Sequence, residues 1–293
     1  MNGFLRLAAA AGAFVSAAGA MDLQSGLGRI AEQAGGRMGV SAVLVETGEH
    51  VAWHGDQPFF MASTVKFPVA LQVLNLVDGG KLSLDKKIPI TAADRPPGVT
   101  TLGGKFQPGA EFSVRELLGY MILNSDNTAC DVLMRICGGP PAVIARVQAL
   151  GIEGIRIDRL EKQLSADDSR SHAKFLKDLR DTSTPDAMAA LLAKFQQGET
   201  LKPSSTVVLR ELMEETTTFP NRLKGLLPPG TTVAHKTGTW GKAATNDVGI
   251  ITLPGGKHVA IAVFSNGSNK SAAEVDHAIA LIGQQVYDYW LPR

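Results

Sequence analysis

The chain has 293 residues, 44% of them hydrophobic, so it can fill the core of one large domain or two medium-sized ones. Its 29 basic and 28 acidic side chains nearly balance and form no charge block, which gives no sign of a polyanionic partner such as a nucleic acid. Composition therefore indicates an ordinary globular protein, and its activity must be argued from motifs.

The first twenty residues differ from the rest. MNGFLR carries one positive charge, the apolar run LAAAAGAFVSA follows, and small residues stand at Ala18 and Ala20. This pattern predicts a signal peptide over residues 1–20, cleaved after Ala20; the alternative is a buried N-terminal helix. The run is too short to span a bilayer, and no later segment has about 18 uninterrupted apolar residues, so we expect a periplasmic or secreted protein without a membrane anchor.

Short alternating or apolar segments predict strands towards both ends of the chain. The first two flank the turn TGE, and the last two are joined by the turn LPGGK. The predicted strands, all expected to be antiparallel, cover residues 40–47, 50–55, 233–240, 246–252 and 258–264. Amphipathic helices are expected before them, near residues 23–35, and after them, over residues 271–290.

The middle of the chain is predicted to be helical. Residues 113–123 begin with a capping box of Ser113 and Glu116, and residues 184–195 begin with Thr184 followed by a proline. A sheet built from both ends predicts an α+β fold, with a five-stranded antiparallel sheet flanked by the N- and C-terminal helices and an inserted all-helical domain. The predicted division gives residues 22–61 and 211–293 to the α/β domain and residues 62–210 to the all-helical domain.

The only cysteines, Cys130 and Cys137, lie in one predicted helix, NTACDVLMRICGG. Two turns of helix separate them by about 10 Å, which is beyond the reach of a disulfide. We therefore expect two free, buried thiols.

Residues 59–77, FFMASTVKFPVALQVLNLV, contain one charged residue, Lys66, and predict a buried helix. The helix is expected to start at Ser63, where FFMA gives way to it. A buried ammonium is costly unless a function requires it. Ser63 stands three residues earlier, which places both side chains on one face within a turn. The pair suits acyl transfer, because the lysine can accept the proton of an attacking serine while the helix N-terminus offers N–H groups to the developing negative charge.

Two further motifs accompany this SxxK pair. The spacing recurs in the polar segments 83–86 and 171–174, so SxxK by itself is a weak signal. SDN at residues 125–127 and KTG at residues 236–238 each occur once, and alone they would be a helix cap and part of a strand. In this order and separation the three motifs point to one active site.

The three motifs resemble those of the class A serine β-lactamases and penicillin-binding proteins. The resemblance covers essentially the whole chain after the signal peptide, including SDNTA at residues 125–129 and HKTGT at residues 235–239, which looks like the branch with histidine before KTG. It implies the two-domain serine β-lactamase fold, with the site in the cleft between the domains. It also implies hydrolysis of penicillins and cephalosporins, which confers antibiotic resistance.

The resemblance assigns the acylation step to three residues. Ser63 would be acylated as it opens the β-lactam ring, while Lys66 and Ser125 would relay protons, the latter to the departing ring nitrogen. Either Lys66 or a glutamate would take the first proton. For the lysine, this requires that burial and the nearby Lys236 lower its pKa from about 10.4 towards 7.

The same resemblance implies the substrate contacts. Asn127 would hold the side-chain amide of the substrate, and its carboxylate would bind Lys236, Thr237 and Thr239. The backbone N–H groups of Ser63 and Thr239 would form the oxyanion hole.

A β-lactamase must also hydrolyse its acyl-enzyme, which requires a base that holds a water. In DRLEKQLS, Glu161 follows Arg159 by two residues and resembles the deacylating glutamate of the family, although alone it would be read as a surface residue. Glu161 favours a β-lactamase over two alternatives that stay open. These are a peptidoglycan DD-peptidase or penicillin-binding protein, and a β-lactam-sensing domain that is acylated once.

The segment around Glu161 departs from the family pattern. Ser165 stands where relatives commonly have an asparagine that helps to hold the water, so deacylation is the step most open to change. The active-site loop over residues 159–181 has 23 residues, 11 of them charged, and is longer than the family pattern suggests. Its end residues, Arg159 and Asp181, resemble a loop-closing ion pair, and we hypothesise that the loop widens the cleft for bulky cephalosporins.

Carboxylate binding shows a second departure, because Thr245 stands where many relatives have an arginine. Arg222 is the candidate replacement, and a solvated arginine at a helix end is the alternative. Trp240 is expected to pack or to shape the edge of the cleft. Because Ala62 precedes Ser63, the disulfide that some carbapenem-hydrolysing relatives form at that position is excluded.

No metal or other cofactor is expected. The six histidines show neither HxH nor HExxH spacing, and the chain has no GxSxG elbow and no P-loop. The only partner expected is a small-molecule β-lactam. Since no sequence pattern indicates an interface, we expect a monomer.

Overall fold

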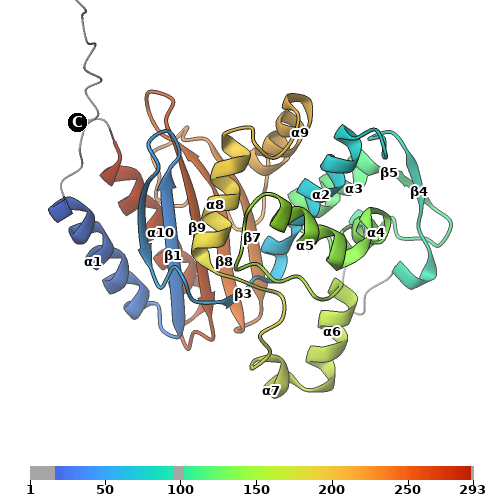
Figure 1. The fold of residues 1–293 in the computed structure, drawn as a ribbon. Coiled ribbons are helices and arrows are strands. Elements are labelled where there is room, and N and C mark those ends of the chain that lie inside the picture. Colours follow the sequence, from blue (N-terminus) through green and yellow to red (C-terminus); the bar gives the residue numbers. More distant parts are fainter. Residues whose placement is uncertain (1–16, 95–101, 292–293) are drawn as a thin grey trace, which may run out of the picture.

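The computed structural model describes residues 17–94 and 102–291 (Figure 1). The predicted signal peptide of residues 1–20 lies outside these ranges except for its last four residues, which begin helix α1 (Ala17–Gln33). Within the described ranges, no helix combines the length and the apolar character needed to cross a membrane.

Five strands form one antiparallel sheet in the order β2-β1-β9-β8-β7. They are β1 (Arg37–Leu44), β2 (Glu49–Trp53), β7 (Val233–Trp240), β8 (Ala244–Thr252) and β9 (His258–Asn266). All five predicted strands are confirmed within a few residues. Because β1 pairs with β9 along its whole length, the sheet joins the two ends of the chain.

Helices cover both faces of the sheet (Figure 1). Helices α1 and α10 (Ala272–Tyr289) pack on one face, and α8 (Pro185–Gln196) packs on the other. Successive side chains of a strand point to opposite faces, so each strand serves two cores. In β9 the core beneath α1 and α10 receives Val259, Ile261 and Val263, and the core beneath α8 receives Ala260, Ala262 and Phe264.

The other helices gather beside the β7 edge of the sheet (Figure 1). They are α2 (Lys66–Asp78), α3 (Val114–Leu123), α4 (Asn127–Cys137), α5 (Gly139–Ala149), α6 (Glu161–Arg170), α7 (His172–Phe175) and α9 (Pro203–Glu214). Smaller elements are the strand pairs β3 (Phe59–Phe60) with β6 (Thr182–Ser183) and β4 (Lys87–Pro89) with β5 (Glu111–Ser113), and the 3-10 turns η1 (Ala62–Val65), η2 (Ala92–Asp94) and η3 (Leu102–Gly104).

Helices α2, α3, α4, α5 and α9 share one continuous core with the sheet face beneath α8. The predicted fold class, an antiparallel five-stranded sheet with flanking helices and a helical insertion, is confirmed. The residue boundaries of the two domains stay a prediction.

Local signals set several helix ends as predicted. The Ser113 hydroxyl accepts a hydrogen bond from the Glu116 backbone, and the Glu116 carboxylate accepts one from the Ser113 backbone, which completes the capping box of α3. The Thr184 hydroxyl caps α8 by accepting a hydrogen bond from the Ala187 backbone at 3.1 Å. Cys130 and Cys137 are both buried and free, as expected.

The helix predicted to start at Ser63, where FFMA gives way to it, begins three residues later, at Lys66. Residues 59–60 form β3 and residues 62–65 form η1, so α2 begins at Lys66. Ala62 has a φ of 46°, a left-handed conformation that a regular right-handed helix does not contain. Ser63 therefore lies in a tight turn that leads into the helix.

Candidate active site

Hydrogen bonds to the sheet hold the turn that carries Ser63. The Asn246 side chain in β8 donates to the carbonyl oxygens of Phe60 and Met61, each at 2.9 Å. The Thr64 hydroxyl donates to the Met61 carbonyl at 2.8 Å. These bonds fix Ser63, which is half-buried, one turn before the start of α2, where helix N–H groups favour negative charge.

The buried Lys66 ammonium is surrounded by acceptors. Its Nζ lies 2.9 Å from Ser63 Oγ, 2.8 Å from the Ser125 carbonyl oxygen and 2.6 Å from Asn127 Oδ1. Glu161 Oε1 lies 3.2 Å from the same nitrogen. Lys66 is fully buried, so these partners compensate a charge that would otherwise be costly, and they bring the SxxK and SDN motifs and Glu161 together.

Lys236 completes the group from strand β7. Its Nζ donates to Ser125 Oγ at 2.9 Å and to the Thr237 carbonyl at 2.8 Å. Burial, together with the positive charge of Lys66, lowers the pKa of Lys236 well below its usual value. Ser125 is held in place by its neighbour Asp126, whose carboxylate caps α4 through Ala129 N at 2.9 Å.

Glu161 begins helix α6 and is almost completely buried. Its Oε1 accepts no hydrogen bond from the described residues, which leaves an acceptor for a bound molecule beside Lys66. Asp131 in α4 accepts hydrogen bonds from the backbone of Glu161 at 2.7 Å and of Lys162 at 3.1 Å. Leu160, the residue before α6, has no side-chain oxygen, so Asp131 caps α6 from another helix.

Sequence reasoning missed Asp131. Burial and the negative charge of Glu161 raise the pKa of this carboxyl to about 7. The available signal was a charged residue between apolar neighbours in a helix, as at Lys66.

Arg222 lies beside the KTG strand and is 1% exposed, so the solvated alternative is wrong. Its Nη2 donates to Thr239 Oγ1 at 2.8 Å, and its Nε donates to Asp276 Oδ1 at 2.7 Å. Thr237 Oγ1 lies 2.7 Å from Thr218 Oγ1 on the same side of β7. A buried guanidinium paired with one carboxylate thus stands directly behind the Thr239 hydroxyl.

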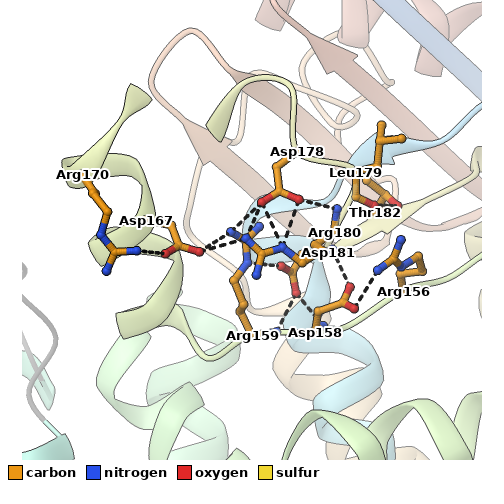
Figure 2. Close-up of polar contacts among 10 residues, drawn as sticks. All are labelled: Arg156, Asp158, Arg159, Asp167, Arg170, Asp178, Leu179, Arg180, Asp181 and Thr182. Carbon is orange, nitrogen blue, oxygen red and sulfur yellow. Dashed lines mark hydrogen bonds and ion pairs between the residues drawn. The ribbon is translucent and has the colours of Figure 1, made fainter. Parts of the chain in front are cut away.

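Charged side chains tie the loop of residues 159–181 together, as Figure 2 shows. The predicted pair between its ends is confirmed, because Arg159 Nε lies 2.6 Å from Asp181 Oδ2. Arg159 Nη1 also contacts Asp167 at 2.8 Å and Asp178 at 3.1 Å. Arg180 binds the same two aspartates, and its hydrogen bonds lower the pKa of Asp178 to about 2. Within this frame the loop is largely helical, since it contains α6 and α7.

The remaining predicted residues also lie near this loop. Ser165 is half-buried in α6, one turn after Glu161. Trp240 packs against Phe60 and Phe175, with ring centroids 6.0 and 5.4 Å away, so packing, one of the two roles expected for it, is observed. Among the residues that the structure describes, no group of three or more His, Cys, Asp and Glu side chains is arranged to hold a metal ion.

Comparison with known proteins adds independent information. The model of a family described as "Beta-lactamase enzyme family" matches residues 22–290. The extended-spectrum beta-lactamase PER-1 of Pseudomonas aeruginosa is 40% identical over 244 residues, which cover 81% of this chain and 77% of PER-1. Beta-lactamase VEB-1 of the same organism is 35% identical over 265 residues, which cover 88% of this chain and 86% of VEB-1.

Solved structures give the same result. The crystal structure of TLA-1 extended-spectrum beta-lactamase superposes with a TM-score of 0.87 at 35% identity, covering 94% of this chain and all of that one. A beta-lactamase from Chitinophaga pinensis superposes with a TM-score of 0.84 at 35% identity, covering 91% of this chain and 98% of that one.

Proposed function

This chain belongs to the beta-lactamase enzyme family, and we propose that Ser63 is its nucleophile. It is a class A serine β-lactamase, which hydrolyses the β-lactam ring and so confers antibiotic resistance. One observation carries this assignment. The nitrogen of Lys66 contacts Ser63, Ser125, Asn127 and Glu161 within 3.4 Å, so that the candidate nucleophile, base, relay and substrate-binding residues share one centre.

Acylation follows from the contacts of Lys66. Transfer of its proton to Glu161 across 3.2 Å leaves a neutral amine 2.9 Å from Ser63 Oγ. This amine takes the hydroxyl proton as Ser63 attacks the lactam carbonyl. Ser125 Oγ lies 3.4 Å from Lys66 Nζ; it passes a proton to the ring nitrogen as the C–N bond breaks and regains one from Lys66. The proton held by Glu161 then returns to the Lys66 amine, which restores the Glu161 carboxylate before deacylation.

Deacylation is assigned to Glu161. Its Oε1, which accepts no hydrogen bond from the described residues, accepts one from a water and takes a proton from it as the water attacks the acyl carbonyl. Ser63 Oγ regains a proton through Lys66 as the ester bond breaks. Asp131 is a positioning residue in this step, because it fixes the first turn of the helix that carries Glu161.

The substrate carboxylate is assigned to the β7 side of the site. Lys236, Thr237 and Thr239 offer an ammonium and two hydroxyl groups, and Arg222 adds a second positive charge behind Thr239. Asn127 binds the amide of the acylamino side chain. The backbone N–H groups of Ser63 and Thr239 stabilise the oxyanion, and loss of one such donor typically costs on the order of 100-fold in rate.

The proposal includes export and a monomeric state. The charged start, apolar run and small residues of segment 1–20 support a signal peptide and therefore a periplasmic or secreted enzyme. No membrane anchor, nucleic acid, metal or other cofactor is part of the proposal.

Ring opening and protein mass can be followed together to test these roles. Purified protein is mixed with excess chromogenic cephalosporin, and we expect sustained turnover with no accumulated adduct. Glu161→Gln should stop turnover and accumulate an acyl-enzyme on Ser63, whereas Glu153→Gln, at an exposed site, should behave like the parent. One stoichiometric burst from the parent would instead indicate a penicillin-binding protein or a sensing domain.

A further inference from the structure

The segment that connects α9 to β7 passes beside the KTG strand. Its Thr218 hydroxyl lies 2.7 Å from the Thr237 hydroxyl. Four residues later, Arg222 donates a hydrogen bond to Thr239 at 2.8 Å. The segment is therefore attached at two points to the side of β7 that is assigned to the substrate carboxylate.

Phe219 lies between these two contacts and has a strained backbone. Its φ of 48° falls in the left-handed region, which a bulky side chain rarely adopts. The next residue is a proline, and a residue before proline is restricted towards extended conformations with negative φ. Glycine would fit this backbone without strain. A strained residue beside a candidate site points to a role for its side chain.

The Phe219 ring covers the Arg222 guanidinium. The distance from the ring centroid to the guanidinium carbon is 3.9 Å. The edge of the guanidinium makes the hydrogen bonds, to Asp276, to Thr239 and to two carbonyl oxygens of the sheet, so its flat face is left for the ring. Arg222 is buried whereas Phe219 is 42% exposed, so the ring lies between the guanidinium and solvent.

A ring in this place acts on the Arg222 charge in two ways. It keeps water from the guanidinium face, and a positive charge attracts a neighbouring anion more strongly where water is excluded. It also restrains the guanidinium plane, which keeps Nη2 directed at the Thr239 hydroxyl. Both effects strengthen the attraction of a carboxylate bound at Thr239.

We propose that Phe219 is a positioning residue for carboxylate recognition, because its ring holds Arg222 in place and shields it from water. This inference rests on the proposed function, in which Arg222 adds a positive charge behind Thr239. The ligands that depend on Phe219 are those that carry a carboxylate at this end of the site. Ligands without that charge depend on it little.

Two boronic acids provide the measurement, because boronic acids add reversibly to a nucleophilic serine and imitate the tetrahedral intermediate. Both compounds carry the same acylamino group, and one adds a carboxylate in the place of the substrate carboxylate. The readout is the inhibition constant of the uncharged compound divided by that of the carboxylate compound, measured against a chromogenic cephalosporin. Phe219→Gly removes the ring and should lower this ratio about threefold or more, a factor typical of a cation–π contact. Phe219→Tyr keeps the ring and should keep the ratio within about twofold of the parent.

Two controls test whether the ring acts through Arg222. His54→Gly removes another exposed ring from a residue with a φ of 50°, beside β2 at the opposite edge of the sheet, and should leave the ratio unchanged. In a background of Arg222→Met with Asp276→Leu, the guanidinium and its carboxylate partner are both absent. Adding Phe219→Gly to that background should not change the ratio further.

The proposal is refuted if Phe219→Gly keeps the parental ratio, or if it lowers the ratio equally with and without Arg222. Asparagine also tolerates positive φ, so Phe219→Asn provides the same measurement if the glycine variant does not fold. A parent that hydrolyses no cephalosporin, or that binds both boronic acids equally, would overturn the proposed function instead.

Discussion

Replacement of Asp131 by asparagine should stabilise the protein at pH 8 and change its stability little at pH 5. Burial and the charge of Glu161 raise the pKa of Asp131 from 3.8 to about 7. The folded protein therefore binds this proton more tightly than the unfolded chain does, and stability falls as the pH rises between these two values. At about 1.4 kcal/mol per pK unit the full cost is about 4 kcal/mol above pH 7, of which about 3 kcal/mol appears between pH 5 and pH 8.

Asparagine carries no charge and so avoids this cost. Its single oxygen serves only one of the two backbone N–H groups of Glu161 and Lys162, which costs about 1 to 3 kcal/mol at any pH. The expected gain at pH 8 is therefore about 1 to 3 kcal/mol, and the expected change at pH 5 is close to zero. Urea unfolding of both proteins at the two pH values measures this difference directly.

Two controls distinguish the effect of the Asp131 charge from the effect of the changed side chain. In a Glu161→Gln background the pH-dependent gain should shrink, because one of the two causes of the raised pKa is gone. Asp94→Asn should show the opposite sign, because hydrogen bonds from Thr91 and Arg135 outweigh burial and lower the pKa of Asp94. A stability difference between Asp131→Asn and the parent that stays constant or shrinks from pH 5 to pH 8 would refute the reasoning.

Two other substitutions test the substrate side and the deacylation side of the site. Arg222→Met should raise KM. Because it leaves the buried Asp276 without its ion-pair partner, it should also lower the free energy of unfolding by about 3 to 5 kcal/mol. The double variant Arg222→Met with Asp276→Leu should recover the stability but not the parental KM, and recovery of both would show that Arg222 acts only through the fold. Ser165→Asn should speed deacylation, so that kcat and KM rise together while kcat/KM, which reports acylation, stays constant; a change in kcat/KM alone in steady-state kinetics would contradict this role.

Signals that operate within a few residues predicted the fold well. The bounds of β7 were predicted residue for residue. The composition of this strand differs from that of the segments beside it in sequence, and the sheet that contains it is covered by helices on both faces. The caps at Ser113 and Thr184 were predicted because a side chain and the helix it caps are neighbours in sequence. The predicted start of α2 at Ser63 is three residues early, because the left-handed Ala62 belongs to a turn stabilised by Asn246, far away in the chain.

The same distinction applies to the site. Ser63, Lys66, Ser125 and Lys236 were found because three short motifs together identify one chemistry, and the structure brings them into contact. Asp131 and the partners of Trp240 carry no motif, because their roles depend on how α6 and α7 dock on α4 and β7. An acid between apolar residues of a helix can be seen in a sequence, but the packing of the fold decides which groups it contacts. The residues that perform the reaction are therefore easier to find in the sequence than those that set the geometry of the site.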